Sequence, residues 1–160
     1  MSSPAQRKDS LSDVFVAAKT FGEICKWSVS NLKMQKILYL SNMVCLGRYK
    51  TPLLPTPFEA WDFGPVQPVL YHKLKRFGAD NVRDVFYGEE MLTEGEGFVA
   101  LNDMLGLCSF RPGQLVALTH REGGAWSRVY KPGGKGIVID NSLISEEYTK
   151  LFLESKSSDV

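Results

Sequence analysis

The stretch ILYLSNMVCL, Ile37 to Leu46, constrains the fold more than any other part of the sequence. It belongs to a longer segment, LKMQKILYLSNMVCLGRY, which follows Ser30 and Asn31, two residues suited to cap a helix. As a helix, this segment would be apolar on nearly every face, and such a helix is usually buried on most sides. We therefore expect it to be the most buried element, at the centre of the core.

The remaining pattern predicts a mainly α fold of the α+β class, a compact single domain of about six helices with two or three short strands. SLSD at Ser10–Asp13 resembles a capping box, and apolar residues at helical spacing after it predict a helix over 12–26. Further helices are expected in four places, namely Val66–Phe77, Phe98–Cys108, Pro112–His120 and, after Ser142 or Ser145, Ile144–Phe152.

Prolines limit where strands can form. The segment KTPLLPTPFEAWDFGPV holds four prolines and a glycine, so it predicts an extended connector in which FEAW is at most a short edge strand. Pro65 would suit the first turn of the next helix, where its missing N–H is harmless. NVRDVFYG and GIVID are the other candidate strands, whereas GGAWSRVYKPGGKG is glycine-rich and is expected to be a loop.

The length of 160 residues fits one domain, expected over 12–154 with a frayed segment 1–11 and a disordered tail 155–160. A net charge of +1 gives no general attraction to nucleic acid or anionic lipid. The N-terminus lacks the apolar core of a signal peptide, and no apolar stretch is long enough to span a bilayer. Cys25, Cys45 and Cys108 are widely spaced, which is typical of reduced, buried thiols. We expect a cytoplasmic protein.

LTHREGGAW, Leu118 to Trp126, holds one of the two histidines. His120 with Glu122 is a candidate acid–base pair for a small hydrolase. The favoured alternative is that Thr119 and His120 cap the preceding helix and hold the loop of Trp126. The two histidines lie in different elements with no cysteine nearby, so a metal site is not expected. Neither a nucleophile elbow nor a phosphate-binding loop occurs, and we expect no cofactor.

HKLKRFG, His72 to Gly78, is a basic run that a DNA-binding regulator could place in a groove. Lys73, Lys75 and Arg76 would also lie in the last turns of a helix, where cations favour the helix dipole. A helix-turn-helix needs a second helix at short spacing, and the proline-rich connector provides none. We therefore expect no nucleic-acid partner.

Aromatic residues gather in or beside irregular segments, as interface anchors often do: Trp61, Phe63, Tyr71, Trp126 and Tyr130. In EAWDFGPV, Gly64 and Pro65 should stiffen the turn, so that little entropy is lost on docking. We expect Trp61 to be mainly buried, and Phe63, Gln67 and Tyr71 to face a partner. The alternative is that Trp61 packs on Trp126 and both belong to the core.

The order of three motifs resembles the SocA-like antitoxin family, also called the Panacea domain and met in phages as GepA-type proteins. The motifs are a K-x-x-K-ϕ-ϕ-Y helix, an E-A-W-x-x-G-P-V turn and an L-T-H-x-E-x-x-W corner. Here they are Lys33, Lys36 and Tyr39; Glu59, Ala60, Trp61, Gly64, Pro65 and Val66; and Leu118, Thr119, His120, Glu122 and Trp126. The resemblance covers residues 12–153, although GGA before Trp126 is longer than the pattern.

This resemblance implies a bacterial or phage antitoxin of the cytoplasm that is not an enzyme. It would neutralise a toxin encoded by a neighbouring gene through direct binding, and some members are adaptors that deliver the toxin to a ClpXP-type AAA+ protease. The family has no established catalytic, cofactor-binding or metal-binding residues, so the resemblance implies none in this sequence. The resemblance therefore implies a structural or partner-facing corner made of Trp61, Gly64, Pro65, Thr119, His120, Glu122 and Trp126.

Overall fold

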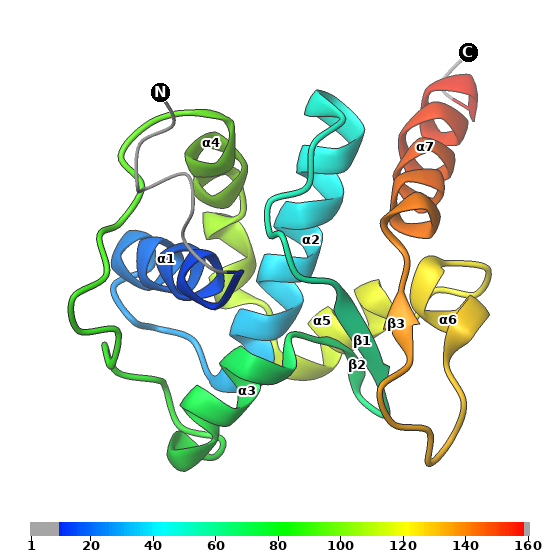
Figure 1. Cartoon of the computed structure of the whole chain (residues 1–160). Helices are drawn as coiled ribbons and strands as arrows, with labels where there is room; N and C mark the ends of the chain where they lie inside the picture. Colours follow the sequence, from blue (N-terminus) through cyan, green and yellow to red (C-terminus); the bar gives the residue numbers. More distant parts are fainter. Residues whose placement is uncertain (1–9, 159–160) are drawn as a thin grey trace.

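A computed structural model describes the backbone of residues 10–158 and the side chains of residues 14–152 (Figure 1). The described chain forms a helical domain with one small antiparallel sheet, which confirms the expected mainly helical α+β fold. In order, the elements are α1 (Ser10–Ile24), α2 (Asn31–Tyr49), β1 (Phe58–Trp61), β2 (Gly64–Val66), α3 (Pro68–Leu74), η2 (Lys75–Phe77), α4 (Glu96–Asp103), η3 (Leu105–Ser109), α5 (Pro112–Thr119), α6 (Ala125–Val129), β3 (Val138–Ile139) and α7 (Asn141–Ser158).

Helix α2 runs through the middle of the molecule, with α1 and α4 on one side and α7 on the other (Figure 1). The Ser30 hydroxyl accepts a hydrogen bond from the Lys33 N–H at 3.3 Å and caps the helix, and the chain leaves it at Lys50 in a left-handed conformation. Within Ile37–Leu46, only Leu40 is not fully buried. The expectation that this segment is the most buried element is confirmed.

The sheet has the strand order β2-β1-β3, and both pairings are antiparallel. Trp61 pairs with Gly64 across a tight turn formed by Asp62 and Phe63, and Phe58 pairs with Ile139. The expectation that FEAW is an edge strand is wrong, because β1 is the central strand. The prolines of this segment suggested an edge strand. Pro52, Pro55 and Pro57 all precede β1, however, so they do not interrupt its pairing on either side.

Pro65 also differs from its predicted place. It lies in β2, an edge strand, where a missing ladder donor is tolerated. The proline at the first turn of α3 is Pro68, three residues later.

Other boundaries differ in smaller ways. NVRDVFYG forms no strand, and Asn81 makes only an isolated bridge with Ser30. The glycine-rich segment, which was expected to be a loop, contains helix α6, and the glycine nearest to it, Gly124, lies just before its first residue. The predicted helix Phe98–Cys108 divides into α4 and η3 at Met104. Helix α7 continues to Ser158, beyond the expected domain end at residue 154, whereas most of 1–11 lies outside the described residues.

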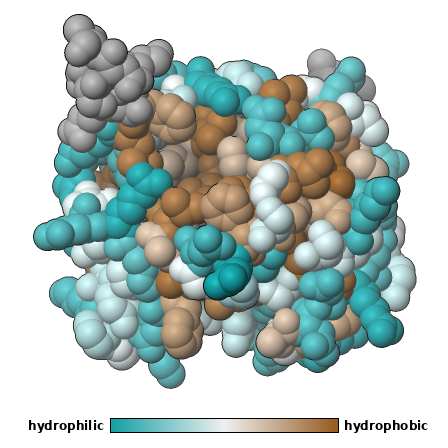
Figure 2. All heavy atoms as spheres, turned by 180° about the vertical axis from the view of Figure 1, so that it is seen from behind, coloured by the Kyte–Doolittle hydropathy of each residue, from teal (hydrophilic) through white to brown (hydrophobic). Residues whose placement is uncertain are grey.

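Helix α7 lies close against α2 because Gly47 leaves room for Tyr148. On the face opposite to that of Figure 1, apolar side chains gather around a central hollow (Figure 2). The three thiols are free, with Cys25 and Cys45 buried as expected but Cys108 only half-buried. Within the described part of the chain, no helix is long and apolar enough to cross a membrane.

Candidate functional site

The turn between β1 and β2 carries an exposed aromatic residue and lies next to a cavity. Phe63 stands at its tip with 69% of its surface exposed. Two side chains from the α6 region hold the turn: the Trp126 indole N–H donates to the Trp61 carbonyl at 2.8 Å, and the Tyr130 hydroxyl donates to the Asp62 carboxylate at 2.5 Å. The exposed aromatic ring therefore stands on a fixed base.

Three rings form a continuous stack behind this turn. His120, at the C-terminal end of α5, lies 3.6 Å from Trp126 between ring centres with the planes 9° apart. Tyr130 stacks on the other side of Trp126 at 4.4 Å. Trp126 is 8% exposed and belongs to the core, which agrees with one half of the alternative expectation, but Trp61 is only half-buried. The Trp61 ring does not stack on Trp126, and the two residues meet through the hydrogen bond to the Trp61 carbonyl.

At Gly64 the hairpin lies close to both α2 and α5. Its backbone has a φ of +110°, a conformation that favours glycine. A Cβ atom here would lie 2.9 Å from Cε of Lys36 and 3.0 Å from Oγ1 of Thr119. Thr119 is buried and donates its hydroxyl proton to the Val116 carbonyl at 3.0 Å. The structure thus brings Thr119, His120, Gly64, Trp61 and Trp126 together.

Glu122 is the member of the predicted corner that stays apart, because its side chain is exposed. His120 is half-buried, and its Nε2 atom is buried without a hydrogen-bond partner among the described atoms. Burial, together with the nearby charge of Lys36, lowers the pKa of His120 against a smaller opposing effect of a backbone hydrogen bond at Phe63. The acid–base pair of His120 and Glu122 is not assembled. The described side chains also hold no cluster of His, Cys, Asp or Glu suited to a metal.

Glu147, on α7, is the carboxylate that does enter this region. It is buried, and its Oε1 atom accepts hydrogen bonds from the Ala125 N–H at 3.0 Å and from the Tyr39 hydroxyl at 3.5 Å. Burial raises the pKa of Glu147, and these two hydrogen bonds only partly offset that effect. Sequence reasoning missed this residue. The one available signal was an acidic residue next to Tyr148 in the apolar stripe of the last helix.

Lys36 is a second residue that the pattern of the chain alone did not single out, although it belongs to the family motif. Its side chain is 1% exposed, and its ammonium group donates to the Pro65 carbonyl at 3.0 Å. Removal from water lowers the pKa of Lys36 to about 7. A lysine among apolar residues on the most buried helix was the signal that could have found it.

Of the three residues expected to face a partner, Gln67 does not. It is 1% exposed, and its side-chain amide donates to the Thr56 and Pro57 carbonyls at 2.7 and 3.1 Å. The expectation for Gln67 is wrong because the residue ties the proline-rich connector to the hairpin. Tyr71 is half-buried and packs edge-on against Trp61 at 4.9 Å between ring centres.

The basic run is divided between the end of α3 and a 3-10 turn. Helix α3 ends at Leu74, and Lys75 to Phe77 make a 3-10 turn. The Lys73 ammonium lies 5.6 Å from the centre of the Phe15 ring and so covers α1. Residues 78–95 contain no helix that could complete a helix-turn-helix.

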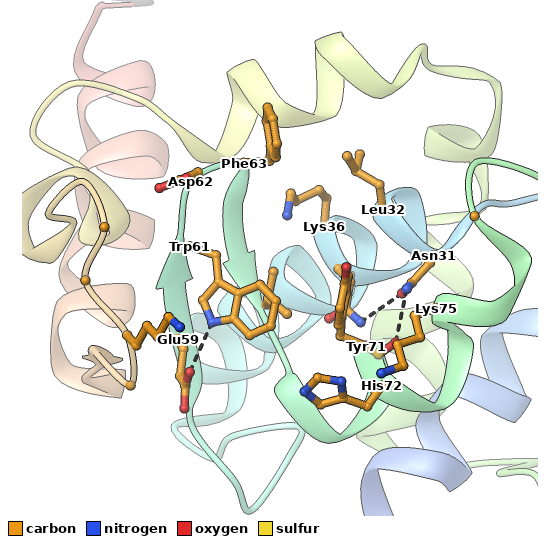
Figure 3. Close-up of a pocket in the computed structure, with 17 residues that line it drawn as sticks. Asn31, Leu32, Lys36, Glu59, Trp61, Asp62, Phe63, Tyr71, His72 and Lys75 are labelled. Atoms are coloured by element: carbon orange, nitrogen blue, oxygen red, sulfur yellow. Dashed lines mark hydrogen bonds between the residues drawn. The ribbon is translucent and has the colours of Figure 1, made fainter.

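A cleft of about 710 Å³ opens between the hairpin, α2, α3 and the glycine-rich loop before β3 (Figure 3). Trp61 and Tyr71, whose rings are in edge-on contact, line one part of it, and Asn31 donates to the Tyr71 carbonyl at 3.3 Å (Figure 3). Trp61 in turn donates its indole proton to Glu59 at 3.0 Å. The charged or titratable side chains that line the cleft are Lys36, Glu59, Asp62, His72, Lys75 and Lys135.

Comparison with known proteins supports one family. The family model "Antitoxin SocA-like, Panacea domain" matches residues 34–104. "Antitoxin SocA" of Caulobacter vibrioides (strain NA1000 / CB15N) is 29% identical over 135 residues, which cover 75% of this chain and 72% of the relative. The resemblance to the SocA-like antitoxin family is confirmed. No solved structure matches the chain. The SocA-like match includes Lys36, Trp61 and Tyr71, whereas Thr119–Trp126 lies outside residues 34–104.

Proposed function

We propose that this protein is an antitoxin that neutralises a partner toxin by binding it directly. The family match and the relative named antitoxin support the general role. The observation that carries the binding surface is Phe63, 69% exposed on a turn that two side-chain hydrogen bonds hold in place. The role needs no catalytic residue, and it places the protein in the cytoplasm with its toxin.

An exposed phenylalanine on a fixed turn has the energetics of an interface anchor. Burying its apolar surface is favourable by about 25 cal/mol per Å². Since Trp126 and Tyr130 already order the turn, docking costs little further conformational entropy. Tyr71 stands next to this surface through its contact with Trp61. We assign Thr119, His120 and Trp126 the supporting role of holding the turn from behind.

The class of function is tested by co-expression. Each gene adjacent to that of this protein is expressed alone and together with it, and growth is followed. We expect one neighbour to arrest growth and this protein to restore it. Full toxicity of that neighbour in the presence of this protein, or no toxicity of either neighbour, would argue against the antitoxin role.

The surface is tested by Phe63→Ala and Tyr71→Ala, measured for folding by circular dichroism and for toxin binding by calorimetry. We expect both variants to fold and Phe63→Ala to weaken binding at least about tenfold, as for a central anchor. Tyr87→Ala is the matched control, because Tyr87 is 85% exposed on a different segment. If Phe63→Ala and Tyr71→Ala stay folded and bind as tightly as the wild type, the interface lies elsewhere.

The family resemblance also supports a finer form of the proposal, in which this protein delivers the toxin to a ClpXP-type protease. The half-life of the toxin, measured with this protein present, separates the two forms. Delivery predicts a short half-life that lengthens in cells without the protease, together with a return of toxicity. An unchanged half-life of the toxin, together with full neutralisation, would support direct binding without delivery to a protease.

A further inference from the structure

The wall of the cleft contains a buried cation. Lys36 projects from the central helix α2 toward strand β2 and lines the same cleft as Trp61 and Tyr71, whose rings are in contact (Figure 3). Its side chain is 1% exposed, yet it lines the cavity. An ammonium group has three protons to donate, and the Pro65 carbonyl accepts one of them.

The nearby carboxylates are engaged elsewhere. Glu59 accepts from the Trp61 indole, and Asp62 accepts from the Tyr130 hydroxyl. The ion pairs among the described residues are Lys19–Asp84, Arg48–Asp103 and Arg128–Glu146, so none of them includes Lys36. A buried charge is normally paired, because desolvation disfavours an isolated ion. The cleft therefore offers a cation that lacks a counterion within the described chain.

Besides the carboxylates of Glu59 and Asp62, the lining of the cleft includes apolar and positively charged side chains. Trp61 and Tyr71 present aromatic rings, and Val66 adds an aliphatic group. Lys75 and Lys135 are exposed lysines at its lining, where they would attract an anion from solvent. An apolar pocket with a few placed polar groups is the usual form of a small-ligand site.

We propose that this cleft binds an apolar group that carries a carboxylate, with the carboxylate at the Lys36 ammonium and the apolar part against the rings of Trp61 and Tyr71. This goes beyond the antitoxin role and does not depend on it. Such a group is present both at the C-terminal end of a protein chain and in a free small acid, and the experiment below separates these two sources.

Binding at this site depends on pH through the charge of Lys36, because burial brings its pKa to about 7. An anion beside it favours the protonated form, so binding takes up a proton above pH 7. The other charged or titratable groups around it are His120 from α5, Glu59 and Asp62 from the hairpin, His72 and Lys75 from the α3 region, and Lys135. His72→Gln is the control for proton uptake by groups of the cleft other than Lys36.

The test uses two matched pairs of probes and the full chain. One pair is acetyl-Gly-Gly-Phe with a free carboxylate and the same peptide as its amide, and the other is phenylacetate and phenylacetamide. Isothermal titration calorimetry at pH 6.5 and pH 9, in buffers of different ionisation enthalpy, reports affinity and proton uptake. We expect an acid to bind at least about tenfold tighter than its amide at pH 6.5, to weaken at pH 9, and to take up protons in between.

Lys36→Met should abolish the preference for the acid over the amide. Lys33→Met is the matched control, because Lys33 is on the same helix but donates to the Cys108 carbonyl instead of lining the cleft. Binding of the peptide acid alone assigns the site to a chain end, and binding of phenylacetate assigns it to a small acid; both support the proposal. Equal binding of acid and amide, no binding of either acid at millimolar concentration, or an unchanged preference in folded Lys36→Met would overturn it.

Discussion

Glu147 acts at the start of α6 in the way a capping side chain acts at the start of other helices. Its Oε1 atom accepts from Ala125 and Tyr39, whereas Oε2 is buried without a partner among the described atoms. Since burial raises its pKa, the folded protein favours the protonated carboxyl group. The stability that this group contributes is therefore greatest at low pH, and it is lost as the pH rises through the folded pKa.

Two substitutions at Glu147 separate the hydrogen bonds from the charge. Glu147→Gln keeps an acceptor for Ala125 and Tyr39 and removes the charge, so we expect its free energy of unfolding at pH 7 to equal or exceed that of the wild type. Glu147→Ala leaves both donors unpaired and should lower it by about 1–3 kcal/mol. Urea denaturation measures both values. A glutamine variant as unstable as the alanine variant would contradict this account.

The close contact at Gly64 can be tested by a single substitution. Gly64→Ala would adopt a φ of +110° and bring a methyl group within 3.0 Å of Lys36 and Thr119, so we expect a loss of about 2 kcal/mol or more. Gly113→Ala is the control, because a Cβ atom there meets nothing within 4 Å in helix α5. It should be neutral or stabilising by up to about 1 kcal/mol. Thermal melting that ranks the two variants equally would show that the contact at Gly64 does not matter.

At the scale of elements, the sequence predicted what depends on local periodicity. The apolar spacing around Ile37–Leu46 predicted α2 and its burial, because a helix apolar on all faces has only the core to occupy. Strand order was not predictable from β1 alone, since its place at the centre is decided by Val138–Ile139 far along the chain. Helix α6 was hidden by glycines because its start is satisfied by Glu147 rather than by a local cap.

In the candidate site, too, residues in local motifs were predictable from the sequence, whereas residues brought in by the fold were not. Trp61, Thr119, His120 and Trp126 were found from the sequence because they lie in short motifs, and the fold then placed them together. Glu122 was the carboxylate close to His120 in sequence, but it is exposed, whereas Glu147 enters this region from α7, which packs beside α6. Gln67 was expected at the surface because it lies at the start of the helix that follows the turn, and only the folded connector shows that its amide bonds inside the protein.

The contact between α2 and α7 provides an element-scale prediction. A Cβ atom on Gly47 would lie 2.1 Å from Cδ1 of Tyr148. Gly47→Ala should therefore displace Tyr148 and lower the melting temperature, although alanine is the better helix former. In the double variant with Tyr148→Ala, most of the loss caused by Gly47→Ala should disappear, because residues in contact are not additive. Additive losses would mean that the helices do not meet at this pair.

At the scale of the whole molecule, Lys36 makes stability depend on pH. Its pKa is about 7 in the folded protein, against 10.5 for a lysine side chain in water, so the unfolded chain holds more protons between these limits. The free energy of unfolding should then rise with pH from 7 to 8.5, by about 1 kcal/mol per pH unit. Above that range, the raised pKa values of the Cys45 and Cys108 thiols, both about 11, act in the opposite direction.

Lys36→Met tests this dependence, because methionine has a similar length and no charge. We expect the variant to be as stable as the wild type or more so at pH 7, with a flatter profile from pH 7 to 8.5. Lys33→Met should keep the wild-type slope. Urea denaturation at half-unit steps of pH gives both profiles, and a slope that survives in Lys36→Met would assign the dependence to other groups.

The central place of β1 has a consequence for how the chain is made in the cell. One edge of β1 pairs with its neighbour β2 at once, but the other waits for Val138–Ile139, which a ribosome adds late. Until then, a nascent chain exposes an unpaired strand edge and the apolar side of Phe58, which is the kind of surface that aggregates or recruits chaperones. Trp126 and Tyr130, which fix the turn of Phe63, also emerge late. The turn that carries Phe63 is therefore held in place only after Tyr130 has been translated.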